Sequence, residues 1–175
     1  KKTSYMFMLK QLKSWISKLE LKKNKSIWGK YEKYNTYNEK SLSEKEKIVA
    51  QFVKKVKPNK LIDLGCNNGQ FSKISIENGA KEVIAVDFDI NAISNTYEIS
   101  KKKNLNLLPL FIDLSNPSPN QGWRQSERQG FKERFKCDAV IALAIEHHLI
   151  IGKNIPINQF VEWIINFGKF GLLEF

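Results

Sequence analysis

The sequence predicts an α/β fold in which a Rossmann-like, doubly wound sheet of mainly parallel strands lies between helices. Three apolar runs, at residues 61–64, 83–86 and 107–112, have the length and composition of buried strands. Helical patterns separate them, and this alternation is typical of parallel βαβ units. Because the carboxyl ends of parallel strands meet at one edge of the sheet, we expect the residues that follow the runs to line one crevice.

The composition fits one globular domain. The chain has 175 residues, of which 42% are hydrophobic, and this is enough for a sizeable core. No run approaches the roughly 20 apolar residues of a membrane span, and the first residues lack a signal-peptide pattern, so we expect a cytoplasmic protein. Cys66 and Cys137 lack the spacing of a metal site, and we expect two reduced thiols without a disulfide.

The positive charge belongs to the N-terminal third of the chain. Residues 1–60 hold 17 Lys and Arg and 5 Asp and Glu, a net charge of +12, whereas residues 61–175 hold 12 and 13, a net charge of −1. An enzyme of nucleic acids usually carries positive charge around its active-site mouth. The charge of residues 61–175 therefore favours a small-molecule substrate.

Residues 1–40 form a basic, aromatic-rich lead-in to a main domain expected over residues 41–175. Residues 4–28 have the pattern of an amphipathic helix with a lysine-rich outer face. Its apolar residues are Phe7, Trp15, Ile16 and Leu19, with Leu9, Leu12 and Leu21 close to the same stripe. Such a helix either binds nucleic acid or an anionic membrane, or packs on the domain with its lysines in solvent, and its apolar content favours packing.

Two further features precede the first strand. Five large side chains crowd together and suit either the wall of a ligand pocket or packing against the sheet edge: Ile27, Trp28, Tyr31, Tyr34 and Tyr37. Ser43 and Glu46 then have the spacing of a capping box, which predicts a helix that begins there and ends before Pro58.

Residues 60–72, KLIDLGCNNGQFS, predict a strand, a tight turn and the start of a helix over residues 70–78. Gly65 and Gly69 bound the turn, and Asn67 lies within it, where Asn tolerates a positive φ better than most residues. Glycine lets a ligand approach the backbone, and the N–H groups at the start of the helix point outward. The turn therefore marks a candidate nucleotide site.

Acidic residues end the next two strands. Asp87 follows the second strand with Phe88 behind it, and Asp113 follows the third, after a helix expected over residues 90–102. In doubly wound sheets an acid at the position of Asp87 binds the ribose hydroxyls of an adenosine cofactor. The glycine pattern of NAD-binding domains is absent, which disfavours that class.

The motifs DLGCNNG, VDFD and FIDL together resemble the cofactor-binding half of the class I S-adenosylmethionine-dependent methyltransferases. In that family the acid before the first Gly and the Gly turn hold the methionine end, the acid after the second strand binds the ribose, and the acid after the third lies by the adenine amine. The resemblance thus implies S-adenosylmethionine as cofactor, with S-adenosylhomocysteine as product. The residues it assigns to the cofactor are Asp63, Gly65, Asn67, Gly69, Asp87, Phe88 and Asp113, although many members have Gly where this chain has Asn67.

The segment after the third strand sharpens the resemblance. Its LSNPSP and GWRQSER motifs, with ALAIEHHL further on, look like a bacterial subgroup of these methyltransferases related to host-specific nodulation proteins, over residues 28–175. Pro117 and Pro119 forbid a regular helix at its start, so we expect one only over residues 124–135. Trp123 and Arg124 belong to the signature and are candidates for substrate binding; the alternative is that Trp123 plugs the end of the sheet and Glu127 pairs with an Arg.

A fourth strand over residues 139–144 leads to the candidate catalytic residues Glu146, His147 and His148. The resemblance implies that residues just after this strand lie beside the transferred methyl group. An imidazole near its ordinary pKa can accept a proton from a hydroxyl or an amine. Metal binding is not expected, because adjacent side chains diverge and no third ligand is evident.

The last elements are a helix over residues 157–167, which Pro156 begins and Gly168 ends, and a fifth strand over residues 171–175. The family fold continues with a further helix and a pair of strands. We therefore expect a domain truncated after the fifth strand, whose open apolar edge favours self-association unless a partner covers it.

These observations predict an enzyme that transfers a methyl group from S-adenosylmethionine to an oxygen or nitrogen nucleophile of a small molecule. One alternative is an RNA or protein methyltransferase that holds its substrate with the basic N-terminal helix. The other is a binding module that has the cofactor fold without catalysis. The fold alone decides neither.

Overall fold

The computed structural model describes residues 2–19 and 39–175, and its centre is a five-stranded parallel sheet. The strands are β1 (Lys60–Leu64), β2 (Glu82–Asp87), β3 (Leu107–Phe111), β4 (Ala139–Ala142) and β5 (Phe170–Leu173). Their order is β3-β2-β1-β4-β5, and every neighbouring pair is parallel. The chain adds β2 and β3 on one side of β1 and then returns to add β4 and β5 on the other side. A doubly wound sheet has its ligand crevice at such a chain reversal, which here lies between β1 and β4.

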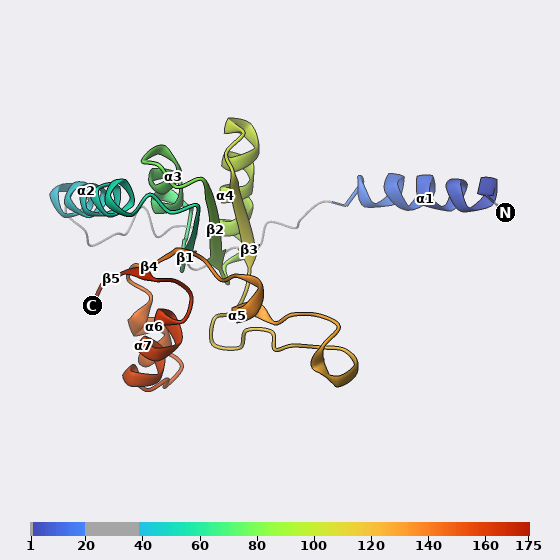
Figure 1. Ribbon diagram of the computed structural model, residues 1–175. Coiled ribbons are helices and arrows are strands. Elements are labelled where there is room, and N and C mark those ends of the chain that lie inside the picture. Colours follow the sequence, from blue (N-terminus) through green and yellow to red (C-terminus); the bar gives the residue numbers. More distant parts are fainter. Residues whose placement is uncertain (1, 20–38) are drawn as a thin grey trace.

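Helices cover both faces of this sheet (Figure 1). They are α2 (Glu39–Val56), α3 (Gln70–Glu77), α4 (Ile90–Lys103), α5 (Phe131–Arg134), α6 (Glu146–Ile150) and α7 (Ile157–Ile165); the chain also has α1 (Lys2–Ile16), which does not cover the sheet, and a 3-10 turn η2 (Trp123–Gln125). Figure 1 shows α2, α3 and α4 on one side of the strands and α5, α6 and α7 on the other. The predicted doubly wound α/β fold is confirmed.

Alternate residues of each strand enter two separate cores, as the twofold repeat of a strand requires. Leu61 packs with Val49 and Val53 of α2 on one face. Ile62 packs with Ile164 of α7 on the other face. Because both faces are covered, the strands read as nearly continuous apolar runs in the sequence.

A carboxylate fixes β1 against β4 at the end of the sheet remote from the strands' carboxyl ends. Asp138 Oδ2 accepts hydrogen bonds from the backbone N–H groups of Asn59 (2.8 Å) and Lys60 (3.0 Å), and Asp138 N donates to Lys60 O. These bonds join segments that lie 78 residues apart in the sequence. They therefore support the pairing on which the chain reversal depends.

Three predicted helix boundaries are wrong. The amphipathic helix expected over residues 4–28 ends at Ile16, and residues 17–19 are not helical. Helix α2 begins at Glu39, so Ser43 lies inside the helix and is not its cap, because the helix-forming residues before it extend the helix toward the N-terminus. The expected helix over residues 124–135 is interrupted, since Arg124 (φ 53°) and Gln125 (φ 57°) have left-handed backbone conformations. Only α5 is helical there after the short turn η2.

Helix α1 contains no buried residue, and Figure 1 shows it apart from the sheet. The prediction that its apolar side packs on the domain is therefore wrong for residues 2–19. The aromatic segment at residues 27–37 and Leu21 lie outside the described residues. Within the two described ranges, no helix has the length and apolar character needed to cross a membrane.

Candidate active site

The turn between β1 and α3 approaches the crevice with three residues at positive φ. They are Gly65 (φ 78°), Asn67 (φ 47°) and Gly69 (φ 72°). A Cβ at Gly65 would lie 2.6 Å from Ile145 Cδ1, and one at Gly69 would lie 2.6 Å from Thr96 Cγ2. Both glycines are thus required by contact as well as by backbone conformation, whereas Asn67 adopts a positive φ, which Asn tolerates better than most residues.

Asp63 is the last residue but one of β1, and its carboxyl group is buried, with the residue only 2% exposed. Its Oδ2 atom accepts a 2.5 Å hydrogen bond from Ser72 Oγ in α3. Burial raises the pKa of Asp63 to about 7, with the Ser72 bond opposing this rise and the charge of Asp87 adding to it. Asp63 therefore changes its charge in the neutral pH range.

Asp87 joins the two turns that border the crevice. Its Oδ2 atom accepts a hydrogen bond from Asn67 N (2.8 Å), and its Oδ1 atom accepts one from Asp89 N (2.9 Å). Burial raises the pKa of Asp87, and the backbone hydrogen bonds from Asp89, Asn67 and Phe88 oppose this rise. One carboxylate at the end of β2 thus holds the Gly turn and the start of α4 in a fixed relation.

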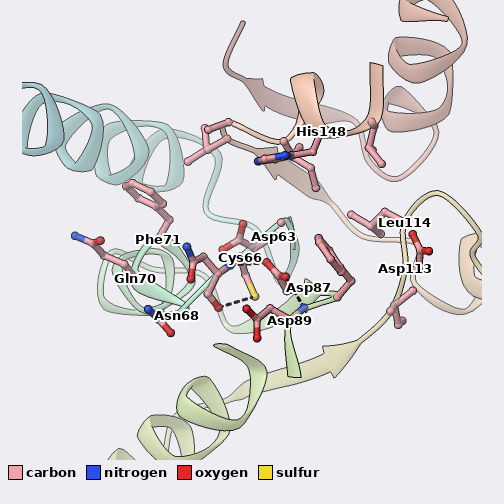
Figure 2. Close-up of a pocket in the computed structure, with 18 of the residues that line it drawn as sticks. Asp63, Cys66, Asn68, Gln70, Phe71, Asp87, Asp89, Asp113, Leu114 and His148 are labelled. Carbon is pink, nitrogen blue, oxygen red and sulfur yellow. Dashed lines mark hydrogen bonds between the residues drawn. The ribbon is translucent and has the colours of Figure 1, made fainter. Parts of the chain in front are cut away.

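These residues surround a crevice of about 310 Å³ at the carboxyl ends of the strands (Figure 2). Six of the seven predicted cofactor residues line it: Asp63, Gly65, Asn67, Asp87, Phe88 and Asp113. Gly69 is the exception: it is the N-cap of α3, and it faces Thr96 of α4. Figure 2 labels three acids at the carboxyl ends of β1, β2 and β3, and it shows Asp113 beside Leu114, which also lines the crevice.

The structure separates the three candidate catalytic residues. His148 lines the crevice, as Figure 2 shows, whereas Glu146 and His147 do not. Burial is the main cause that lowers the pKa of His148, and the neighbouring His147 lowers it further, while Glu146 and Asp87 act in the opposite direction. His147 is exposed, and its Nδ1 atom lies 3.2 Å from Glu146 Oε1.

The two carboxylate oxygens of Glu146 have different surroundings, since only Oε1 lies close to His147. Glu146 Oε2 is buried and has no hydrogen-bond partner among the residues that the structure describes.

Within the described residues, no group of three His, Cys, Asp or Glu side chains could hold a metal ion. Cys66 and Cys137 are free thiols, and burial raises the pKa of both, so neither is a ready thiolate.

The two predicted substrate residues, Trp123 and Arg124, do not reach the crevice. Neither lines it, and Trp123 is 78% exposed in a loop that Figure 1 shows extending away from the sheet. The alternative that Trp123 plugs the end of the sheet is therefore wrong. Gly122 has φ 85°, and a Cβ there would lie 2.4 Å from Glu127 Cβ, so the loop has a defined backbone shape.

Sequence reasoning missed the wall that α2 contributes. Leu42 and Lys45 line the crevice from this helix, beside Phe71 of α3. Lys45 Nζ lies 2.5 Å from Glu174 Oε2 and 5.1 Å from the centre of the Phe71 ring. The helical spacing from Leu42 and Lys45 to the buried Val49 was the available signal, because residues at this spacing share one side of a helix.

Comparisons with known proteins agree with this geometry. The family described as tellurite resistance protein TehB matches residues 23–121, more than half of the chain. Nodulation protein NoeA of Rhizobium meliloti (strain 1021) is 46% identical over 175 residues, which cover 99% of this chain and 37% of NoeA. The chain thus spans little more than a third of this relative.

Two solved structures show the same fold. A SAM-dependent methyltransferase from Aquifex aeolicus is 19% identical, with a TM-score of 0.54 over 82% of this chain and 68% of that one. WbdD is 15% identical, with a TM-score of 0.60 over 94% of this chain and 36% of that one. The predicted relation to class I methyltransferases and to nodulation proteins is confirmed. The chain belongs to the TehB family, is related to NoeA and has the fold of the class I S-adenosylmethionine-dependent methyltransferases.

Proposed function

We propose that the chain binds S-adenosylmethionine in the crevice and transfers its methyl group to an oxygen or nitrogen nucleophile of a small molecule. One observation carries the proposal. Asp63, the turn at Gly65, Asp87 and His148 come from three different strand ends and line a single crevice at the chain reversal. Membership of the TehB family and the methyltransferase fold support it.

The residues present fit this cofactor. S-adenosylmethionine offers hydrogen-bond donors on its ammonium, ribose and adenine groups, and it carries positive charge on sulfur. The crevice supplies acceptors of matching chemistry, including Asp87 and Asn67 Oδ1, which is buried without a partner among the described residues. Asp113 adds a carboxylate whose pKa the Ser115 hydroxyl lowers through a 2.6 Å hydrogen bond, and the half-exposed ring of Phe88 suits one face of adenine.

When bound, the cofactor supplies a methyl group on a sulfonium, which already has a good leaving group. The chain therefore has to align the acceptor and exclude water. His148 Nδ1 or Nε2 can take the proton of a hydroxyl or amine acceptor, because its lowered pKa keeps the imidazole neutral near pH 7. Leu114 and Leu149 line the same crevice and reduce the access of water.

The charge of the crevice favours a small acceptor over a nucleic acid. Four carboxyl side chains and only two lysines line it: Asp63, Asp87, Asp89, Asp113, Lys45 and Lys153. A nucleic-acid backbone needs neutralisation of its phosphates by positive charge, and this surface supplies little. The acceptor class stays part of the proposal, and the experiment below separates it from the cofactor.

Isothermal titration calorimetry of S-adenosylmethionine and S-adenosylhomocysteine into the chain tests the first half of the proposal. We expect micromolar affinity, and we expect Asp87→Asn to weaken it by about ten- to a hundredfold, since a charged hydrogen-bond acceptor is lost. Glu82→Gln is the matched control, because Glu82 lies at the other end of the same strand and pairs with Lys60. Absence of binding by the folded chain would refute the proposal.

Label transfer tests the second half. Tritium from methyl-labelled S-adenosylmethionine is followed into small hydroxyl and amine compounds, into RNA and into protein. Transfer to a small compound supports the proposed acceptor class. Transfer to RNA or protein alone would replace that class while leaving the cofactor intact, and cofactor binding without any transfer would favour the binding-module alternative.

A further inference from the structure

Helix α1 presents an apolar stripe that no described residue covers. Six side chains recur at the spacing of one helical face and form this stripe: Tyr5, Met8, Leu9, Leu12, Trp15 and Ile16. All are exposed, from 38% for Leu9 to 60% for Trp15. An uninterrupted apolar stripe of this kind on a surface helix marks an interaction site.

The remainder of this helix carries lysines and no acid, together with the exposed side chains of Met6 and Phe7. Phe7, which the sequence pattern predicted on the apolar side, lies about 140° around the helix from the centre of the stripe. Residues 1–19 contain five lysines and no Asp or Glu. At about 100° per residue, Lys2 and Lys13 fall beside the Leu9 edge of the apolar stripe, and Lys10 falls opposite it. The helix thus combines an apolar side with positive charge along its border.

Charge and polarity together select the partner. A nucleic acid would cover the lysines but leave the apolar stripe in water. A second copy of α1 would cover the stripe but bring lysines together without an acid to pair with them. The surface of an anionic bilayer satisfies both sides, because phosphate groups surround the lysines while the stripe enters the boundary of the acyl chains.

The aromatic residues of α1 agree with a position in the plane of the surface. Tyr5 and Trp15 lie within the apolar stripe, and these amphipathic side chains favour the membrane interface. We propose that α1 is an interfacial helix that attaches the chain to anionic lipid bilayers, independently of the function of the crevice.

Flotation of the chain with lipid vesicles tests this proposal. We expect binding to mixed phosphatidylcholine and phosphatidylglycerol vesicles to be at least about tenfold tighter than to pure phosphatidylcholine vesicles, because each lysine near an anionic surface adds attraction. Raising the salt concentration to about 1 M should weaken the binding, since the screening length then falls to roughly 3 Å. Equal binding to both vesicle types, or no binding to either, would overturn the proposal.

Two matched variants test the role of the apolar stripe. Trp15→Gln removes an aromatic side chain from the stripe, and Phe7→Gln removes one of similar exposure, 63% against 60%, from outside it. We expect about a tenfold weaker vesicle affinity for Trp15→Gln and less than about a twofold change for Phe7→Gln. Equal losses of vesicle affinity in the two variants would show that the stripe is not the contact surface. Because neither residue is buried, the melting temperature of the domain should be unchanged in both variants.

The other partners give distinct results in the same set of proteins. Lipid-free dimerisation in sedimentation velocity, abolished by Trp15→Gln, would assign the stripe to a second copy of the chain. Filter binding of RNA that survives Trp15→Gln but is lost in Lys10→Gln with Lys13→Gln would assign α1 to nucleic acid. Either result without anionic-vesicle binding would overturn the bilayer proposal, and none of them alters the calorimetric test of the crevice.

Discussion

Ser72 Oγ donates a 2.5 Å hydrogen bond to Asp63 Oδ2, and both side chains are almost completely buried between β1 and α3. This single bond does not compensate the carboxylate for the loss of water, so burial raises the pKa of Asp63 to about 7. A group that ionises near neutrality inside the crevice links protonation to both stability and ligand binding.

The first prediction concerns stability against pH. The folded chain keeps the proton on Asp63 up to about pH 7, whereas the unfolded chain releases it near the ordinary value of 3.8. The unfolded state therefore binds fewer protons in this window, and the free energy of unfolding contributed by Asp63 falls as the pH rises from about 4 to about 7. Asp63→Asn should remove this fall, of which roughly 2 to 3 kcal/mol lies between pH 5 and pH 8, as urea denaturation at these two pH values would measure. Glu82→Gln should keep the wild-type slope; an unchanged slope in Asp63→Asn would contradict the prediction.

The second prediction connects the same group to the proposed cofactor. The ammonium of S-adenosylmethionine prefers ionised Asp63, so calorimetric affinity should rise by up to about tenfold per pH unit below pH 7 and level off above it. Ser72→Ala removes a bond that lowers the pKa of Asp63, and it should move this transition to higher pH. A transition at the same pH in Ser72→Ala would show that another group controls binding.

The third prediction concerns the two imidazoles. His147 and His148 are the only histidines of the chain, so NMR titration can follow each ring. The pKa of His148 should lie below 6.5, and His147→Gln should raise it because the neighbouring imidazolium is removed. Glu146→Gln should lower it, since the carboxylate favours the charged ring. Insensitivity of His148 to both changes would contradict the electrostatic coupling.

The fourth prediction compares two glycines at positive φ. Gly65→Ala places a Cβ against Ile145, whereas Gly79→Ala at φ 117° meets no atom within 4 Å. Both variants bear the backbone strain of a left-handed alanine, about 1 to 2 kcal/mol, but only Gly65→Ala should lose further stability and cofactor affinity. Ile145→Ala combined with Gly65→Ala should recover the steric part, which a double-mutant cycle of unfolding free energies measures. Equal losses for the two glycine variants would exclude the contact with Ile145 as the cause.

The cofactor side of the crevice could be predicted because strand direction determines it. Asp63 lies near the end of its apolar run, Asp87 and Asp113 come directly after theirs, and parallel strands bring their carboxyl ends together. Contacts between distant segments could not be predicted in this way. Lys45 reaches the crevice because α2 packs across the sheet face next to α3, and its pairing with Glu174 spans 129 residues of sequence.

Local ambiguity explains the remaining differences. His147 and His148 are neighbours in sequence, and only the start of α6 decides which of them faces the crevice. An amphipathic pattern shows that α1 has an apolar side but does not show what covers it. Trp123 was assigned from its motif, whereas the positive φ values beside it turn its loop away from the sheet.

The sheet order also sets an order of assembly in time. Strand β1 pairs with β2 a short distance along the chain, for example Lys60 with Glu82. It pairs with β4, for example Leu61 with Ala139, only after the residues between β2 and β4 have been synthesised. Closure of short loops is faster than closure of long ones, and domains emerge from the ribosome N-terminal end first. We therefore expect the nascent chain to bring Asp63 and Asp87 together while His148 is still unsynthesised. The donor half of the crevice should exist in the growing chain before its acceptor half, with one edge of β1 open until β4 arrives.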